Sequence, residues 1–281
     1  MLNKTFYSAI FILLLLCPAA FAQKISSINV EKKGMGKQSV ILLAGLGTPN
    51  KVWDETMDRL SGANSFYAIS FSGFAGNKAQ ADPNLALWEK DLAKFIEDQK
   101  LKKPILIGHS LGGTLALKIA ADHPNLFSKI VIVDALPSPA AISNPNFKSK
   151  ENLDCTPFIK QFGGMSKSVF SNFLKNMISQ MVTDEKRKET LLGWFAESGR
   201  KTFGEIYCEL LNIDLRKEIA GIKSPTLVMF QPLFKSKESE VRAQYKLLTN
   251  VDIRFAEKGL HFIMYDDPEW FFDNLRSFLK E

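Results

Sequence analysis

The chain has 281 residues, of which 46% are hydrophobic and 23% are charged. Such a chain can bury a sizeable core, and its composition excludes disordered, collagen-like and low-complexity proteins. The formal net charge is +6, but acidic residues intersperse the basic ones and no long basic stripe forms. Because nucleic-acid binding needs such a stripe, the sequence predicts no nucleic-acid partner.

Residues 1–22 have the features of a cleaved secretory signal peptide. Lys4 supplies a positive charge, residues 6–16 form a mostly apolar run, and residues 20–22 read Ala-Phe-Ala. The apolar run is too short to cross about 30 Å of hydrocarbon comfortably. We therefore expect export to the periplasm or the exterior, without stable membrane insertion. A buried N-terminal helix, an uncleaved anchor and lipidation of Cys17 are the alternatives.

From residue 39 to residue 134, short apolar runs alternate with longer amphipathic runs, which is typical of a parallel sheet covered by helices. The predicted strands are 39–44, 65–71, 104–108 and 129–134, and the predicted helices are 51–60, 84–99 and 111–122. The alternation returns near the end of the chain, with strands expected at 225–230 and 252–256 and helices at 238–248 and 268–279.

Residues 136–212 break this alternation, because they contain helical patches, several prolines and no convincing strand. Helices are expected there at 158–162, 167–181, 184–198 and 202–212. The sequence thus predicts an α/β fold with a mostly parallel central sheet flanked by helices. Its core would comprise residues 23–135 and 213–281, and residues 136–212 would form a helical cap. Since such sheets bind ligands at the carboxyl ends of their strands, we expect the cap over that edge.

Residues 108–112 read Gly-His-Ser-Leu-Gly and lie between a predicted strand and a predicted helix. This is the context that the G-x-S-x-G motif requires. A serine on so sharp a turn has strained backbone angles, and flanking glycines avoid collisions. The Ser110 hydroxyl would lie beside a helix N-terminus, whose N–H groups can stabilise an oxyanion. Ser110 is therefore the candidate nucleophile.

With this motif the chain resembles the α/β-hydrolase superfamily, over essentially its whole length after residue 22. Residues 43–47 are similar to the family's His-Gly loop, with Ala44 where histidine is usual. The resemblance implies a serine hydrolase whose oxyanion hole is made by the N–H groups of Leu46 and Leu111. It also implies a catalytic base in the loop between the last strand and the last helix, where His261 stands.

The third member of the implied triad is not at its usual place. In most members of the family an Asp follows the strand that corresponds to 225–230, but Phe234 stands at about that position here. Some members carry the acid one strand earlier, and Asp134 ends that strand. We expect Asp134 to orient His261 and to stabilise its imidazolium. The alternatives are a purely structural role for Asp134, Glu238 or another residue as the acid, and no acid at all.

The predicted cap is rich in large apolar residues, most of which must pack its helices. The remainder would line an apolar pocket above the nucleophile. The expected lining residues are Gly45, Leu136, Met181, Trp194 and Phe262. The substrate would be a small or medium ester with an apolar acyl or alcohol part. Hydrolysis of a carbon–carbon bond or of a short-peptide amide by the same residues, or ligand binding with little turnover, are the rival hypotheses.

Cysteine and histidine usage bears on metals and on the redox compartment. Cys155 and Cys208 would remain after cleavage, either as a disulfide or as two buried thiols. Neither cysteine has metal-ligand spacing, and the chain has three histidines, so we expect no metal and no cofactor. The sequence leaves the oligomeric state open.

Overall fold

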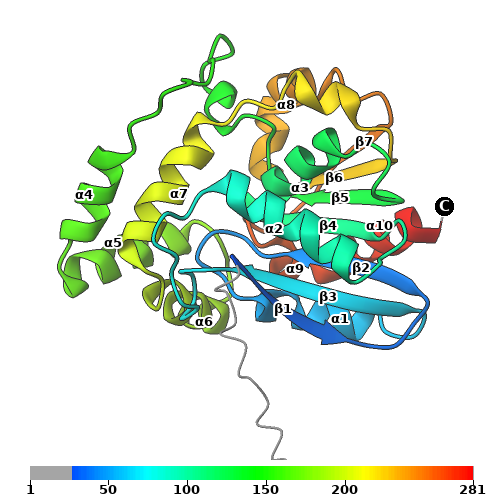
Figure 1. Cartoon of the computed structure of the whole chain (residues 1–281), viewed down its shortest axis with the longest axis horizontal. Helices are drawn as coiled ribbons and strands as arrows, with labels where there is room; N and C mark the ends of the chain where they lie inside the picture. The colour runs from blue at the N-terminus through cyan, green and yellow to red at the C-terminus, as the bar shows by residue number, and fades with distance from the viewer. Residues whose placement is uncertain (1–26, 281) are drawn as a thin grey trace, which may run out of the picture.

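The computed structural model describes residues 27–280, so the predicted signal peptide and Cys17 lie outside the described residues. Seven strands form one sheet in the order β1-β3-β2-β4-β5-β6-β7 (Figure 1). The strands are β1 (Ile28–Lys33), β2 (Gln38–Leu43), β3 (Asn64–Phe71), β4 (Ile105–His109), β5 (Lys129–Val133), β6 (Thr226–Phe230) and β7 (Val251–Phe255). β1 pairs antiparallel with β3, and the other neighbouring strands pair in parallel. The predicted fold class is confirmed.

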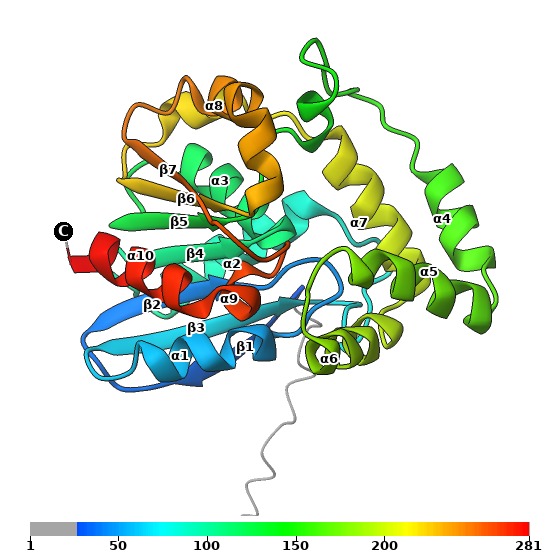
Figure 2. The same ribbon diagram turned by 180° about the vertical axis from the view of Figure 1, so that it is seen from behind.

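Helices cover both faces of the sheet, which explains why its central strands are almost continuously apolar. Figure 1 shows α2 (Leu85–Asp98) and α3 (Leu111–Asp122) on one face, and Figure 2 shows α1 (Asp54–Arg59) and α10 (Pro268–Lys280) on the other. The short helix α9 (Ile263–Asp266) precedes α10, and α8 (Glu238–Tyr245) lies between β6 and β7 in the chain. Within residues 27–280, no helix combines the length and hydrophobicity that crossing a membrane requires.

The sequence analysis missed β1 and α9. β1 is the edge strand, and half-buried residues alternate with exposed ones over its first half before three exposed residues end it. It therefore lacks the continuous apolar run that identifies the central strands. α9 spans four residues, which is too short for a helical period to be recognised in the sequence.

Four helices fill the chain between β5 and β6: α4 (Thr156–Gly164), α5 (Lys167–Ser179), α6 (Glu185–Ala196) and α7 (Arg200–Asn212). They lie together beside one end of the sheet in both views (Figures 1 and 2). Gly47, which follows β2, is so close to α6 that an added Cβ would lie 2.6 Å from the Phe195 ring. Gly73, which follows β3, accepts a hydrogen bond from the N–H of Gly199. This helical segment (residues 136–212) therefore contacts loops at the carboxyl ends of β2 and β3, and its status as a separate cap domain stays a prediction.

A disulfide joins Cys155 to Cys208, with 5.8 Å between the two Cα atoms. Cys155 directly precedes α4 and Cys208 lies on α7, so the bond clamps the start of the helical segment to its last helix. Of the two interpretations that the sequence left open, the structure has the paired one.

Replacing both Cys155 and Cys208 with Ala should lower the free energy of unfolding by about 4 kcal/mol. The reason is that the bond closes a loop spanning 53 residues of sequence separation and so removes chain entropy from the unfolded state. Urea unfolding of the parent protein and of the double variant measures the difference. Reductant should lower the stability of the parent to the same level and leave the variant unchanged. A parent protein that is insensitive to reductant would contradict this account.

Candidate functional site

Ser110 stands on a tight turn between β4 and α3. Its backbone has φ 54° and ψ −123°, a conformation that costs a non-glycine residue on the order of 1–3 kcal/mol. The turn is so tight that a Cβ added to Gly108 would lie 2.2 Å from the carbonyl oxygen of Gly112. The Ser110 N–H is held by the carbonyl of Val133 on the neighbouring strand β5. The sheet thus presents a half-buried serine at its carboxyl edge.

The loop after β2 passes directly beside this serine. A Cβ added to Gly45 would lie 3.3 Å from the Cβ of Ser110. The N–H and the hydroxyl of Thr48 both donate to the carbonyl of Gly45 and close the loop into a turn. Within residues 27–280, the backbone N–H groups of Leu46 and Leu111 donate to no acceptor. Two free donors therefore flank the serine, as an oxyanion hole requires.

The structure brings His261 and Asp134 together. Nδ1 of His261 lies 2.5 Å from Oδ2 of Asp134, whose side chain is 1% exposed. Asp134 directly follows β5, and its N–H donates to the carbonyl of Met229 on β6. Like Ser110, Asp134 has a positive φ, here 50°. Two strained residues thus follow the adjacent strands β4 and β5.

The alternative acid and the usual acid position serve other purposes. Glu238 pairs with Lys235 at 3.0 Å and with Arg242 at 2.8 Å, and these two cations hold the pKa of its carboxyl below its usual range. Phe234 packs its ring 5.0 Å from that of Phe230, the last residue of β6. Neither residue contacts His261 through a hydrogen bond.

Gln231 is a site residue that the sequence analysis missed. Its backbone N–H donates to Oδ1 of Asp134 at 2.9 Å, and its side-chain Nε2 donates to Oδ2 at 2.8 Å. It is the first residue after β6, which pairs with β5, so the parallel register carries it to the carboxylate. The sequence analysis considered carboxylates as the acid at this position, whereas Gln231 acts through a neutral amide donor. Gln231 fixes both oxygens of a buried carboxylate and leaves Oδ2 directed at His261.

His109 also has a position that the sequence did not predict. It is fully buried, and Nε2 lies 3.0 Å from the backbone carbonyl of His261. Burial, together with the neighbouring His261 ring, lowers the pKa of His109 well below its ordinary 6.5. A neutral ring with its proton on Nε2 donates to that carbonyl and anchors the loop of the candidate base.

A model of the α/β hydrolase family matches residues 40–274 of this chain. The chain belongs to the α/β-hydrolase family. Among curated relatives, the pimeloyl-[acyl-carrier protein] methyl ester esterase of Wigglesworthia glossinidia brevipalpis is 23% identical over 88% of this chain and 96% of its own length. The corresponding enzyme of Aeromonas salmonicida (strain A449) is 24% identical over 90% of this chain and 99% of its own length.

Solved structures agree on the fold. An esterase from Exiguobacterium antarcticum superposes with a TM-score of 0.74 at 20% identity, over 90% of this chain and 96% of its own. An enol-lactonase from Burkholderia xenovorans LB400 gives a TM-score of 0.73 at 15% identity, over the same shares. The α/β-hydrolase fold is thereby confirmed, and this chain is a hydrolase with esterase relatives.

Of the five residues predicted to line a pocket, Gly45 has a contact with the candidate nucleophile. Gly45 lies beside Ser110, and the N–H of Phe262 donates to the carbonyl of Met181 at 2.9 Å. Leu136 is buried two residues after Asp134, and Trp194 is half-buried on α6. The substrate contacts of these side chains stay predictions.

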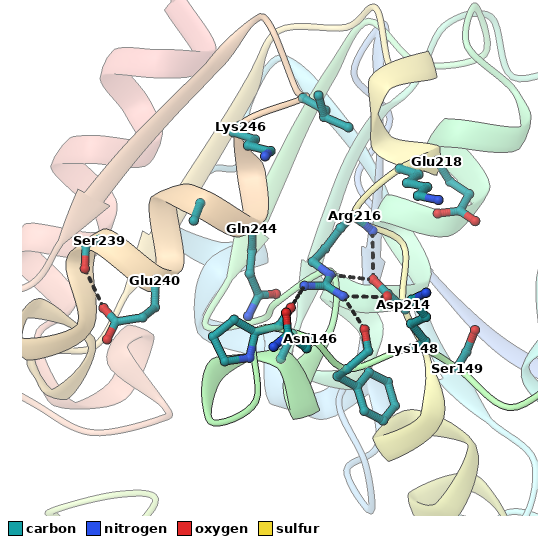
Figure 3. Close-up of a pocket in the computed structure, with 16 residues that line it drawn as sticks. Asn146, Lys148, Ser149, Asp214, Arg216, Glu218, Ser239, Glu240, Gln244 and Lys246 are labelled. Atoms are coloured by element: carbon teal, nitrogen blue, oxygen red, sulfur yellow. Dashed lines mark hydrogen bonds and ion pairs between the residues drawn. The ribbon is translucent and has the colours of Figure 1, made fainter.

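A cavity of about 1300 Å³ lies elsewhere, between residues 141–149, residues 214–218 and α8 (Figure 3). Arg216 is central to it and donates to both carboxylate oxygens of Asp214 and to the carbonyls of Pro145 and Phe147. The guanidinium holds the pKa of Asp214 below its usual range. None of the candidate triad residues lines this cavity. The Arg216 guanidinium is occupied by these hydrogen bonds, which join separate segments of the chain. Among the residues that the structure describes, no histidine lines the cavity, so its serines have no neighbouring imidazole base.

Within residues 27–280, histidine, cysteine and acidic side chains form no cluster of three that could bind a metal ion.

Gln231→Leu should slow the labelling of Ser110 by a fluorophosphonate about tenfold or more. The substitution removes the Nε2 donor but keeps the backbone donor, and a hydrogen bond to a charged group contributes roughly 1.5–3 kcal/mol. The rate of labelling measures the reactivity of the nucleophile, and Gln99→Leu on the exposed end of α2 is the control. Equal rates for the two variants would show that the Gln231 amide does not position Asp134.

The parent protein should lose stability below pH 6.5 relative to His109→Gln, which keeps an N–H donor but does not titrate. The lowered pKa of His109 means that the unfolded chain binds a proton that the folded protein resists, so acid favours unfolding. The loss begins as the pH falls through the ordinary pKa, with a slope of at most about 1.4 kcal/mol per pH unit for one proton. Urea unfolding between pH 5 and pH 8 checks this, and parallel curves for both proteins would contradict it.

Proposed function

We propose that this hydrolase cleaves a small or medium ester with an apolar acyl or alcohol part, through an acyl-enzyme on Ser110. The observation that carries the proposal is the 2.5 Å hydrogen bond between His261 Nδ1 and the buried carboxylate of Asp134. A histidine held in this way by an acid, at the same sheet edge as a serine on a strained turn, has the arrangement of a nucleophile, a base and an orienting group.

In the proposed mechanism, Ser110 Oγ attacks the ester carbonyl carbon and His261 Nε2 takes its proton. The N–H groups of Leu46 and Leu111 stabilise the oxyanion that forms. Asp134 keeps the proton of His261 on Nδ1 and stabilises the imidazolium. His261 then protonates the departing alcohol, and the acyl group remains on Ser110. A water molecule, deprotonated by His261, attacks the acyl-enzyme and releases the acid.

The substrate class is inferred from the apolar helical segment and from the relatives. Met181 and Trp194 are half-buried apolar residues of this segment, and the sequence has no Arg or Lys cluster typical of a phosphate clamp. The two curated relatives are named for a methyl ester of an acyl chain, which supports an ester of a small alcohol. In this proposal the helical segment acts as a cap over the substrate.

We also propose that the enzyme is exported. Residues 1–22 have the pattern of a signal peptide, and the Cys155–Cys208 disulfide suits an oxidising compartment. An exported enzyme would act on free esters rather than on esters attached to an intracellular carrier protein.

Short-chain nitrophenyl esters and a fluorophosphonate probe test the proposal with the mature protein. We expect the parent protein to react with both, and Ser110→Ala and His261→Ala to lose both reactions. Asp134→Asn should lower kcat by about 10⁴, since the amide disturbs the tautomer of the histidine. Glu238→Gln removes a carboxylate whose ion-pair partners among residues 27–280 are Lys235 and Arg242, so its rate should equal that of the parent.

Absence of labelling in the parent protein would overturn the acyl-enzyme proposal. Labelling without ester turnover would instead favour hydrolysis of an amide or of a carbon–carbon bond by the same residues. A collapse of activity in Glu238→Gln, with Asp134→Asn unaffected, would move the role of the acid to Glu238.

A further inference from the structure

The loop that bears His261 is bonded to the helical segment. The N–H of Phe262, the residue after His261, donates to the carbonyl of Met181 at 2.9 Å. Met181 lies in the turn between α5 and α6, about 80 residues earlier in the chain. One side of the candidate base is therefore fixed by a residue from outside the sheet.

Asp266 makes the second connection between the same two segments. Its Oδ2 accepts a hydrogen bond at 2.9 Å from the N–H of Leu260, the residue before His261. Its Oδ1 accepts from the N–H of Thr183 at 2.9 Å and from the Thr183 hydroxyl at 2.7 Å. Thr183 also lies in the turn between α5 and α6. One carboxylate thus joins the loop of His261 to this turn.

The backbone conformation at Gly259 lets the Asp266 carboxylate reach both Leu260 and Thr183. Gly259 has φ +92°, and a Cβ added there would lie 2.7 Å from the Cβ of Asp266. Only glycine permits both this conformation and this close approach. The chain from Gly259 to Asp266 therefore folds back on itself, with His261 in the middle of the fold.

The start of α6 is held to the core next to the contact between Asp266 and Thr183. Arg187 donates to Glu55 of α1 at 2.9 Å and lies 4.1 Å from the centre of the Tyr265 ring. The hydroxyl of Tyr265 in turn donates to the carbonyl of Val52 at 3.0 Å. These contacts keep the turn before α6 close to Asp266.

We propose that Asp266 is a positioning residue that couples the placement of the α5–α6 turn to the orientation of His261. Hydrogen bonds fix the backbone on both sides of His261, at Leu260 and at Phe262. The α5–α6 turn accepts the bond from Phe262 at Met181, and its Thr183 holds the Asp266 carboxylate that accepts the bond from Leu260. When this turn sits on the core, the imidazole faces Asp134. When the turn moves away, the bond from Phe262 is lost and Asp266 loses the Thr183 donors that orient its carboxylate, so the contact of His109 with the His261 carbonyl and the Leu260–Asp266 bond remain as weaker constraints. The inference rests on the proposed role of His261 as the base.

Two variants weaken the contact between Asp266 and Thr183, one by changing each partner. Asp266→Asn weakens the acceptor for Leu260 and Thr183, and Thr183→Val removes only a hydroxyl from the helical segment. Thr183→Ser, which keeps the hydroxyl, and Asp273→Asn, the same change at an exposed position of α10, are the matched controls. Thermal unfolding identifies any variant that fails to fold, in which case the other variant decides.

Amide hydrogen exchange at residues 260–262 and the deshielded Nδ1 proton resonance of His261 report on the loop without any substrate. In Asp266→Asn and Thr183→Val we expect faster exchange and loss of the resonance through exchange with water. For a nitrophenyl ester we expect kcat to fall about 10- to 100-fold with KM nearly unchanged, since a small misplacement of a catalytic group has effects of this size. Both controls should match the parent protein.

Parent-like exchange, proton resonance and kcat in Asp266→Asn would overturn the coupling while leaving the proposed function standing. The coupling is equally overturned if Thr183→Val behaves as Thr183→Ser. If the parent protein hydrolyses no ester, the proposed function fails, and the exchange and resonance measurements still decide whether Asp266 holds the loop of His261.

Discussion

The buried carboxylate of Asp134 is the group around which the candidate site is arranged. A charge removed from water destabilises a protein unless it is hydrogen-bonded or paired. Here the carboxylate has three donors, namely the backbone N–H and the side-chain amide of Gln231 and Nδ1 of His261. Because two of these donors come from the residue after β6 and the third from the loop after β7, the side chain that follows β5 connects three neighbouring strand ends of the sheet. The backbone strain at Asp134 is tolerated because these contacts determine its position.

The parallel sheet makes this arrangement possible with few residues. β4, β5 and β6 are neighbours in the same direction, so the residues that follow them emerge at one edge. Ser110, Asp134 and Gln231 occupy those positions in that order. All three strands are buried almost throughout, which gives the site a rigid base. The loop after β7 brings His261 back toward β5, where its Nδ1 meets the carboxylate of Asp134.

Aromatic side chains pack the helices of the helical segment against one another. Phe203 on α7 lies within 6.5 Å, ring centre to ring centre, of aromatic rings from α4, α5 and α6. The disulfide between Cys155 and Cys208 adds a covalent connection between α4 and α7. This packing makes the segment resistant to deformation, since packed interiors have little compressibility. A displacement of this segment would therefore be transmitted to the loop of His261 through the contacts between them.

The sequence by itself determined most of the architecture, because buried parallel strands read as short continuous apolar runs and amphipathic helices have a 3.6-residue period. It indicated Ser110 as the candidate nucleophile, since the glycines of a strained turn are required locally, and it indicated His261 and Asp134 through the resemblance to a family. It missed the edge strand β1, whose single buried face leaves no continuous apolar run. Only the tertiary structure decided that Gln231 clamps Asp134, that His109 anchors the loop of His261 and that Asp266 reaches Thr183. Those contacts join residues about 80 to 150 positions apart through amide, imidazole and carboxylate groups, and no local pattern in a sequence records which distant partner such a group meets.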